Sequence, residues 1–168
     1  MTTAIGPLLI DALPRLRRYA LSLARAADVA DDLVQAACER ALATAATLDD
    51  RQRFDAWMFR IVRNLWYDRL RRLRTRGEEF DVTVRDDLVA IEGEKLPARR
   101  LLLGEAAAAI DRLPDALREL LLLVCVEELS YRDAAEVLQL PIGTVMSRLA
   151  RARRRVAEDL GVESGRVL

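Results

Sequence analysis

Two short helical patterns separated by a proline turn occupy residues 129–156, LSYRDAAEVLQLPIGTVMSRLARARRRV, and constrain the fold more than any other segment. Ser130 is a favourable N-cap for the first helix, and Asp133, at its third position, suits the positive end of the helix dipole. Residues 139–141 end that helix. Pro141 is tolerated where the second helix begins, because first-turn N–H groups have no intrahelical partner. The pattern predicts a helix-turn-helix, a common DNA-binding motif.

The second helix of this motif has an apolar side and a polar side. At about 100° per residue, the inward side holds Val145, Leu149, Ala152 and Val156, and the outward side holds Ser147, Ala150, Arg151 and Arg154. Arginine forks onto guanine or phosphate, and small neighbours let the backbone approach the bases, so the outward side suits a major groove. A solvated, arginine-rich helix is the alternative interpretation of this stretch taken alone.

The net charge of this chain says little, because its 27 basic and 27 acidic residues cancel, but the charges are unevenly distributed. Residues 51–76 hold nine arginines and two acids, whereas residues 78–94 hold seven acids and one arginine. Such blocks predict two basic surfaces separated by an acidic connector. The glycines, proline and acids of residues 77–100 indicate a flexible linker.

The remaining segments have apolar residues at helical spacing, and no strand pattern runs long enough for a sheet. We expect helices over residues 7–26, 29–46 and 54–74 in a first domain (1–76), and over 101–113 and 115–128 in a second (101–163), followed by a tail (164–168). The predicted fold is therefore all-α, with two small helical domains joined by a flexible linker. The second is a four-helix domain that contains the helix-turn-helix. Expected inward residues are Leu33, Ala37, Cys38, Ala41 and Leu42 in the first domain, and Leu117, Leu120, Leu121, Val124 and Cys125 in the second.

Several classes of function are excluded by what the sequence lacks. Without histidine most zinc and general-base sites are ruled out, and the two cysteines fit core positions better than a disulfide or metal site. No nucleophile with a paired base and no glycine-rich phosphate loop is visible, so neither an enzyme nor a cofactor is expected. The longest apolar run, residues 120–126, is far shorter than the roughly 20 residues of a membrane span. No targeting segment is visible, so we expect a cytoplasmic protein.

The third predicted helix carries a second basic face. Five polar side chains follow one another at helical spacing, opposite an apolar side: Arg60, Arg63, Asn64, Tyr67 and Arg71. Arginines neutralise phosphates, a tyrosine ring stacks on a base, and an amide hydrogen-bonds a base edge, so this face suits single-stranded or distorted nucleic acid. The alternative is a solvated basic helix. In that alternative Trp57 and Trp66 are core aromatics. For Trp66 we expect core packing rather than base contact, because it lies near the edge of the apolar side.

Four segments together resemble the extracytoplasmic-function (ECF) group of bacterial RNA polymerase sigma factors, the small type that keeps only regions 2 and 4. They are DVADDLVQAACERAL (28–42), FDAWMFRIVRNLWYDRLRR (54–72), LPDALRELLLL (113–123) and LSYRDAAEVLQLPIGTVMSRLARARRRV (129–156), in the family's order. The resemblance covers nearly the whole chain and implies a protein that binds core polymerase and promoter DNA without covalent catalysis. It also implies a stress or signal response under an anti-sigma factor. The N-terminal segment is similar to the general-stress branch of alphaproteobacteria, whose anti-sigma factor is small and soluble.

The resemblance implies roles for particular residues. The DDLVQ-type helix would bind the clamp helices of the polymerase's largest subunit through Asp31, Asp32, Gln35 and Glu39, and the second domain would bind the flap. The third helix and the loop 49–53 would recognise the minus-10 element and capture a flipped base, with Asn64 central and Arg60, Arg63, Tyr67 and Arg71 beside it. The recognition helix would read the minus-35 element through Met146, Ser147, Ala150 and Arg151, with Thr144, Arg148 and Arg153 on phosphates and Arg154 on the same outward face.

Two recognition-helix residues depart from the commoner family pattern. Met146 stands where lysine or arginine is frequent, and Ala150 where a larger or polar residue is frequent. Base reading would then rest mainly on Ser147 and Arg151, with DNA shape contributing. Two other functions stay open at this point: a regulator that binds operators by itself, and a sigma-like decoy that only binds an anti-sigma factor. A decoy, however, has no need of arginine-rich DNA faces.

Overall fold

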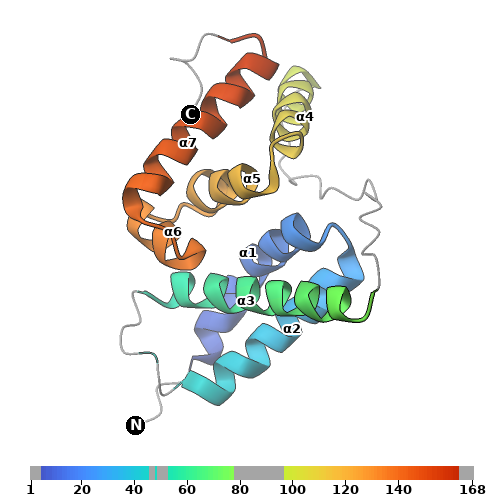
Figure 1. Cartoon of the computed structure of the whole chain (residues 1–168), viewed down its shortest axis with the longest axis vertical. Coiled ribbons are helices and arrows are strands. Elements are labelled where there is room, and N and C mark those ends of the chain that lie inside the picture. The colour runs from blue at the N-terminus through green and yellow to red at the C-terminus, as the bar shows by residue number, and fades with distance from the viewer. Residues whose placement is uncertain (1–4, 46–47, 49–52, 78–96, 163–168) are drawn as a thin grey trace. The chain divides into compact units, whose positions relative to one another are not determined.

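The computed structural model describes residues 5–45, 48, 53–77 and 97–162, and every regular element among them is helical (Figure 1). The chain divides into two compact units, unit 1 over residues 1–89 and unit 2 over residues 90–168. The predicted all-α fold is confirmed. Helix α4 begins at Pro97, inside the stretch predicted as linker, because proline is well suited to the first turn of a helix. The rest of that stretch, residues 78–96, lies outside the described residues.

Unit 1 consists of α1 (Gly6–Ala24), α2 (Ala27–Thr44) and α3 (Phe54–Thr75), and each of these helices packs against the other two. Arg25 adopts a left-handed backbone after α1, so α2 begins only two residues later. Ala20 on α1 and Ala30 and Ala37 on α2 have no exposed surface. Side chains this small let the helix axes approach closely at the contact.

Aromatic rings fill the centre of unit 1. The rings of Tyr19 and Phe59, each 1 % exposed, meet edge to face with their centroids 5.2 Å apart and an interplanar angle of 83°. The Arg15 guanidinium lies 5.4 Å from the Phe59 centroid and forms an ion pair with Asp55, which ties α1 to α3. Trp66 is buried, as predicted. Trp57, a core aromatic in the alternative interpretation of this helix, is half-buried.

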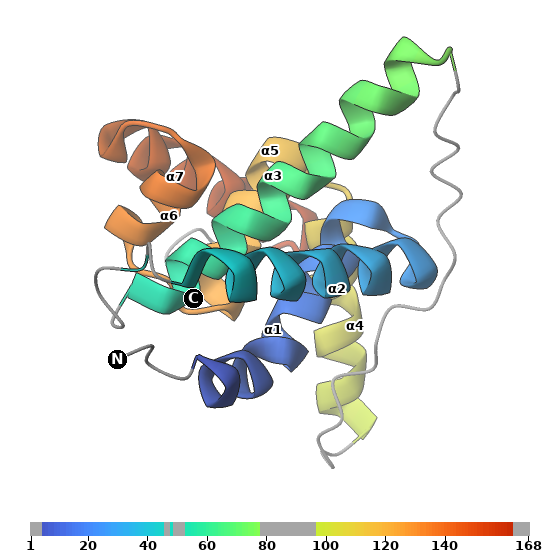
Figure 2. The same cartoon turned by 90° about the horizontal axis from the view of Figure 1, so that it is seen from below.

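Two features of unit 1 lie at its surface. The prediction that Leu42 faces inward is wrong: its side chain is 60 % exposed, because the neighbouring Ala41 takes the buried position and successive helical residues point about 100° apart. The C-terminal turns of α3 extend away from α1 and α2 (Figure 2). Exposed residues dominate there, namely Arg71, Arg72, Arg74, Thr75 and Arg76.

Unit 2 consists of α4 (Pro97–Asp111), α5 (Asp115–Leu121), η3 (Leu122–Val126), α6 (Tyr131–Leu138) and α7 (Ile142–Asp159). Helix α7 packs against α4, α5 and α6, and a hydrogen bond of 2.9 Å from Arg112 Nε to Asp159 Oδ2 joins the ends of α4 and α7. No helix in the described part of the chain is long and apolar enough to cross a bilayer.

The single helix predicted over residues 115–128 is interrupted by a π-helical turn, η3. The Glu127 N–H reaches back five residues to the Leu122 carbonyl at 2.9 Å, and Glu128 then adopts a left-handed backbone. The wider turn changes the direction of the side chains that follow it. Val124 and Cys125 are therefore half-buried rather than core residues, whereas Leu117, Leu120 and Leu121 are buried as predicted.

Candidate nucleic-acid and polymerase interfaces

The helix-turn-helix is built as its sequence predicts. Ser130 caps α6: its Oγ accepts the Asp133 N–H at 3.0 Å and donates to the Asp133 carboxylate at 2.7 Å. Gln139 ends α6 in a left-handed backbone with φ of 55°, and its N–H bonds to the carbonyls of the last turn. Pro141 precedes the first residue of α7. The turn between the two helices is therefore only three residues long.

Helix α7 buries one side and exposes the other. Val145, Leu149, Ala152 and Val156 are at most 3 % exposed. The opposite side presents to solvent Ser147, Ala150, Arg151 and Arg154, the predicted base-reading face. Thr144 and Arg148 are half-buried at the edge of this face, and the Thr144 carbonyl accepts a hydrogen bond from Ser147 Oγ at 3.1 Å. Two arginines and a hydroxyl on one exposed face can donate hydrogen bonds to guanine and to phosphate oxygens.

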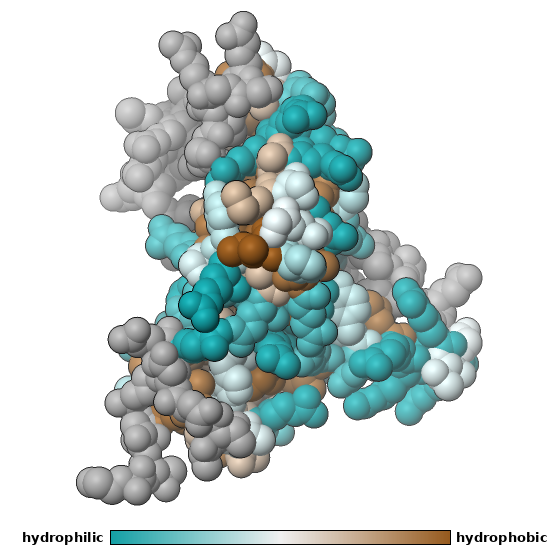
Figure 3. All heavy atoms as spheres, turned by 60° about the vertical axis from the view of Figure 1, so that its left-hand side comes forward, coloured by the Kyte–Doolittle hydropathy of each residue, from teal (hydrophilic) through white to brown (hydrophobic). Residues whose placement is uncertain are grey.

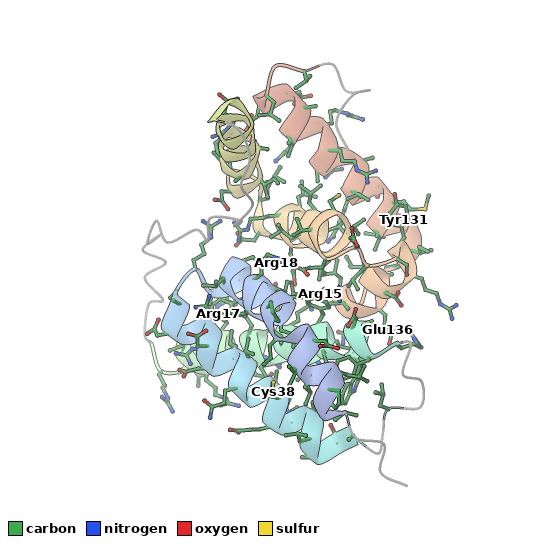
Figure 4. The ribbon with its side chains drawn as sticks, turned by 180° about the vertical axis from the view of Figure 1, so that it is seen from behind. Arg15, Arg17, Arg18, Cys38, Tyr131 and Glu136 are labelled. Carbon is green, nitrogen blue, oxygen red and sulfur yellow. The ribbon has the colours of Figure 1, made fainter. Side chains whose placement is uncertain are left out.

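Arg153, unlike the exposed Arg151 and Arg154, contacts other elements of unit 2. It is half-buried, with Nη2 3.8 Å from Cys125 Sγ in η3, and its Nε is buried without a hydrogen-bond partner in the described residues. Burial disfavours the charged guanidinium, but hydrogen bonds to Cys125 and Tyr131 outweigh it and raise the pKa of Arg153. Tyr131 lies at the start of α6 (Figure 4). Arg153 therefore contacts η3 and α6 within unit 2, and its contact with phosphate stays a prediction.

The basic face of α3 brings an aromatic ring and an arginine into contact. The Arg63 guanidinium lies over the Tyr67 ring, with its central carbon 4.5 Å from the ring centroid. The Tyr67 side chain is 37 % exposed, and Asn64 beside it is half-buried. Arg60 and Arg71 are exposed, and Arg71 forms an ion pair with Asp68 one turn earlier. The exposed part of the Tyr67 ring can stack on a base.

The loop predicted to complete the minus-10 pocket lies largely outside the described residues, which resume at Arg53. Arg53 is exposed immediately before α3. Among the described residues, the candidate minus-10 surface therefore consists of Arg53 and the basic face of α3.

The predicted docking residues of α2 share one exposed, acidic face: Asp31, Asp32, Gln35 and Glu39. Gln35 Nε2 donates to Glu39 Oε1 at 3.1 Å along this face. Arg17 on α1 donates from Nε to Asp31 Oδ1 at 2.7 Å (Figure 4), a contact that the sequence did not predict. A single sequence does not show that two residues 14 positions apart, on different helices, form an ion pair. The face can accept hydrogen bonds from a basic partner.

No group of three or more potential metal ligands lies close together in the described part of the chain. The surface in Figure 3 is mainly hydrophilic, with small apolar patches among charged side chains. The exposed basic and acidic faces support recognition of charged macromolecules.

Comparison with known proteins agrees with this geometry. Residues 9–76 match the family model for sigma-70 region 2, and residues 103–156 match the model for sigma-70 region 4. The ECF RNA polymerase sigma factor EcfG of Rhodopseudomonas palustris is 36 % identical over 97 % of this chain and 88 % of its own. The ECF sigma factor SigW of Bacillus subtilis is 28 % identical over 78 % of this chain and 75 % of its own.

Solved structures show the same relationship. The sigma factor RpoE of Bartonella quintana, crystallised with the anti-sigma factor NepR, has a TM-score of 0.76 and 33 % identity, covering 95 % of this chain and 98 % of that one. CnrH, solved with the cytosolic domain of CnrY, has a TM-score of 0.62 and 28 % identity, covering 94 % of this chain and 88 % of that one. The two matched regions and the similarity over nearly the full length show that this chain belongs to the ECF group of RNA polymerase sigma factors.

Proposed function

We propose that this chain binds core RNA polymerase, directs it to promoters and helps to open the DNA. The observation that carries this proposal is the two-sided α7, which exposes Ser147, Arg151 and Arg154 opposite a stripe at most 3 % exposed. A helix that is anchored in this way presents its outward face to a major groove without rearranging. On this proposal residues 1–76 act as region 2, and residues 101–163 act as region 4 and contact the flap.

The α3 face is the proposed contact with the minus-10 element. Arg60 and Arg71 would contact phosphates, and Asn64 would hydrogen-bond a base taken out of the stack. Tyr67, 37 % exposed and backed by Arg63 at 4.5 Å, would stack on a neighbouring base. Unstacking a base costs a few kcal/mol, so a ring already held in place favours the opened strand.

The acidic face of α2 is the proposed contact with the polymerase clamp helices. Asp31, Asp32 and Glu39 concentrate negative charge on one side of the helix. Charge concentrated in this way speeds association with a basic partner and makes the rate depend on ionic strength. Substitution of these residues should therefore weaken binding to core polymerase, and leave the DNA faces intact.

We also propose that an anti-sigma factor restrains the chain. Two of its structural relatives were solved with a partner: RpoE with the anti-sigma factor NepR, and CnrH with the cytosolic domain of CnrY. The similarity to EcfG and RpoE favours a small soluble anti-sigma factor, as in the general-stress branch. The sigma family is not an enzyme family, and we propose that this chain catalyses no covalent chemistry and acts in the cytoplasm beside the polymerase.

Run-off transcription with purified core polymerase tests the proposal. The chain should direct specific transcripts that core enzyme alone does not make, and the chain alone should bind the same DNA weakly. Arg151→Ala should reduce promoter discrimination by about 1 to 3 kcal/mol. Arg155→Ala removes an exposed arginine of the same helix outside the predicted base-reading face, and should weaken cognate and scrambled DNA equally. Unchanged discrimination in Arg151→Ala would show that α7 is not the reading helix.

Asn64→Ala tests DNA opening separately from binding to core polymerase. The variant should bind core polymerase normally, because Asn64 lies on α3 and not on the proposed docking face of α2, but it should form fewer open complexes. Permanganate reactivity of unpaired thymines measures that step. Reactivity equal to that of the parent would remove Asn64 from the minus-10 contact.

A further inference from the structure

The recognition helix carries an exposed apolar strip along one edge. Ile142 is 51 % exposed and Met146 is 53 % exposed, and Ala150 continues the strip one turn further. These residues follow at intervals of four and therefore lie one above the other on the helix. Such exposure of two large apolar side chains in successive turns is unfavourable in water, so the strip suits a surface that becomes covered on binding.

The strip borders the proposed DNA-reading face. At about 100° per residue, Met146 lies about 90° from the middle of the buried stripe and Ala150 about 130° from it, on the side of Ser147. Arg151 and Arg154 are exposed on the same outward face. Two arginines beside the strip favour a polyanion as its occupant.

Within a DNA major groove the apolar group available to such a strip is the C5-methyl of thymine. We propose that Met146, flanked by Ala150, contacts thymine methyl groups in the upstream promoter element and makes this chain select for thymine there. This inference rests on the proposed function. It adds Met146 to Ser147 and Arg151 as a residue that recognises a base, through an apolar contact instead of a hydrogen bond.

Methionine is well suited to this contact. Its unbranched, polarizable side chain adapts to a methyl group at slightly different positions along the groove. One methyl group removed from water contributes about 0.8 kcal/mol, which corresponds to about a fourfold change in affinity. A lysine or arginine at position 146 would bind acceptor groups instead, so the residue type changes which base is preferred.

Uracil in place of thymine removes only the methyl group and supplies the test. Holoenzyme assembled from this chain and core polymerase first selects promoter fragments from a pool randomised in the upstream element. In a selected fragment, each thymine of that element is then replaced by uracil, and holoenzyme affinity is measured. The parent should lose about 3- to 5-fold for at least one replacement. Met146→Ala should bind the thymine fragment 3- to 5-fold more weakly and show no further loss with uracil.

Two further variants serve as controls in the uracil experiment. Met146→Leu keeps an apolar side chain and should retain most of the sensitivity to uracil. Val126→Ala removes an exposed apolar side chain of unit 2 outside α7, 37 % exposed in the parent, and should respond to uracil as the parent does.

Several results would overturn the inference. A parent that binds thymine and uracil fragments equally at every position has no methyl contact, and equal uracil sensitivity in the parent and Met146→Ala would place the contact elsewhere. An effect of Met146→Ala confined to affinity for an anti-sigma factor would assign the strip to protein docking. If holoenzyme selects no promoter at all, the proposed function itself is wrong. Promoter selection without uracil sensitivity leaves that function standing and removes only the inference.

Discussion

The N-cap of α6 stabilises the helix-turn-helix, and its removal should destabilise unit 2 alone. Ser130 Oγ accepts the Asp133 N–H at 3.0 Å, which satisfies a backbone donor that no helical carbonyl reaches. Ser130→Ala deletes this acceptor and also the 2.7 Å bond to the Asp133 carboxylate. Replacing a serine N-cap by alanine costs about 0.5 to 2 kcal/mol, typically about 1 kcal/mol.

That cost converts into a measurable melting shift. Unit 2 spans Ala90–Leu168. For a domain of about 60 to 100 residues, 1 kcal/mol lowers the melting temperature by about 4 to 8 °C. Ser130→Asn should restore most of the loss, because asparagine is as good an N-cap as serine.

The unfolding of unit 1 can be followed separately from that of the whole chain. Both tryptophans, Trp57 and Trp66, lie in unit 1, so tryptophan fluorescence follows the unfolding of that unit, whereas far-UV circular dichroism follows helices in both. In thermal scans of the full chain, Ser130→Ala should shift the dichroism transition downward and leave the fluorescence transition in place. Equal shifts in both signals, or no shift in either, would refute the local role of this cap.

Three further variants test other parts of the structure. Phe59→Ala should cost about 3 to 5 kcal/mol, because the ring is 1 % exposed at the centre of unit 1; urea unfolding followed by tryptophan fluorescence measures it, and a loss under about 1 kcal/mol would contradict that central place. Burial and the nearby Glu39 carboxylate raise the pKa of Cys38, so its thiol stays protonated at neutral pH. Alkylation of Cys38, followed by peptide mass spectrometry, should accelerate only at a higher pH than for an exposed cysteine. Glu39→Gln should move that profile to lower pH, and an unmoved profile would exclude the electrostatic contribution. Arg17→Ala should change the free energy of unfolding by less than about 1 kcal/mol, because its ion pair with Asp31 is exposed. The same variant should bind core polymerase up to about fivefold more tightly, since Arg17 then no longer competes for Asp31; weaker binding in a titration would argue against the docking role of that carboxylate.

Local chemistry explains which elements were predictable from the sequence. The α6 cap, the proline at the start of α7 and the buried stripe from Val145 to Val156 depend on residues within a few positions of one another, and each is confirmed. The exposure of the α2 acidic face and of the outward α7 face was predictable for the same reason, because helical spacing alone decides which side is apolar.

The features that the sequence did not predict depend on tertiary contacts or on small backbone changes. Two contacts join residues on different helices: Arg17 with Asp31, and Arg153 with Cys125. A single sequence does not show which helices pack against one another. The π-helical turn η3 differs from an α-helix in the spacing of its hydrogen bonds, and its leucine-rich sequence does not indicate that change. Leu42 is apolar but lies about 100° around α2 from the buried Ala41, so its residue type alone did not predict its exposure.

The joint between α6 and α7 is stiffer than a glycine turn would be. Gln139 holds the left-handed backbone there, with φ of 55°, in a position where glycine is the common choice. A residue with a side chain has fewer alternative backbone conformations than glycine, so fluctuations in the angle between the two helices are restrained. Less orientational freedom is then lost when the helix enters a groove. On the proposed function, the rigidity of this single turn contributes to promoter affinity, although Gln139 itself need not touch DNA.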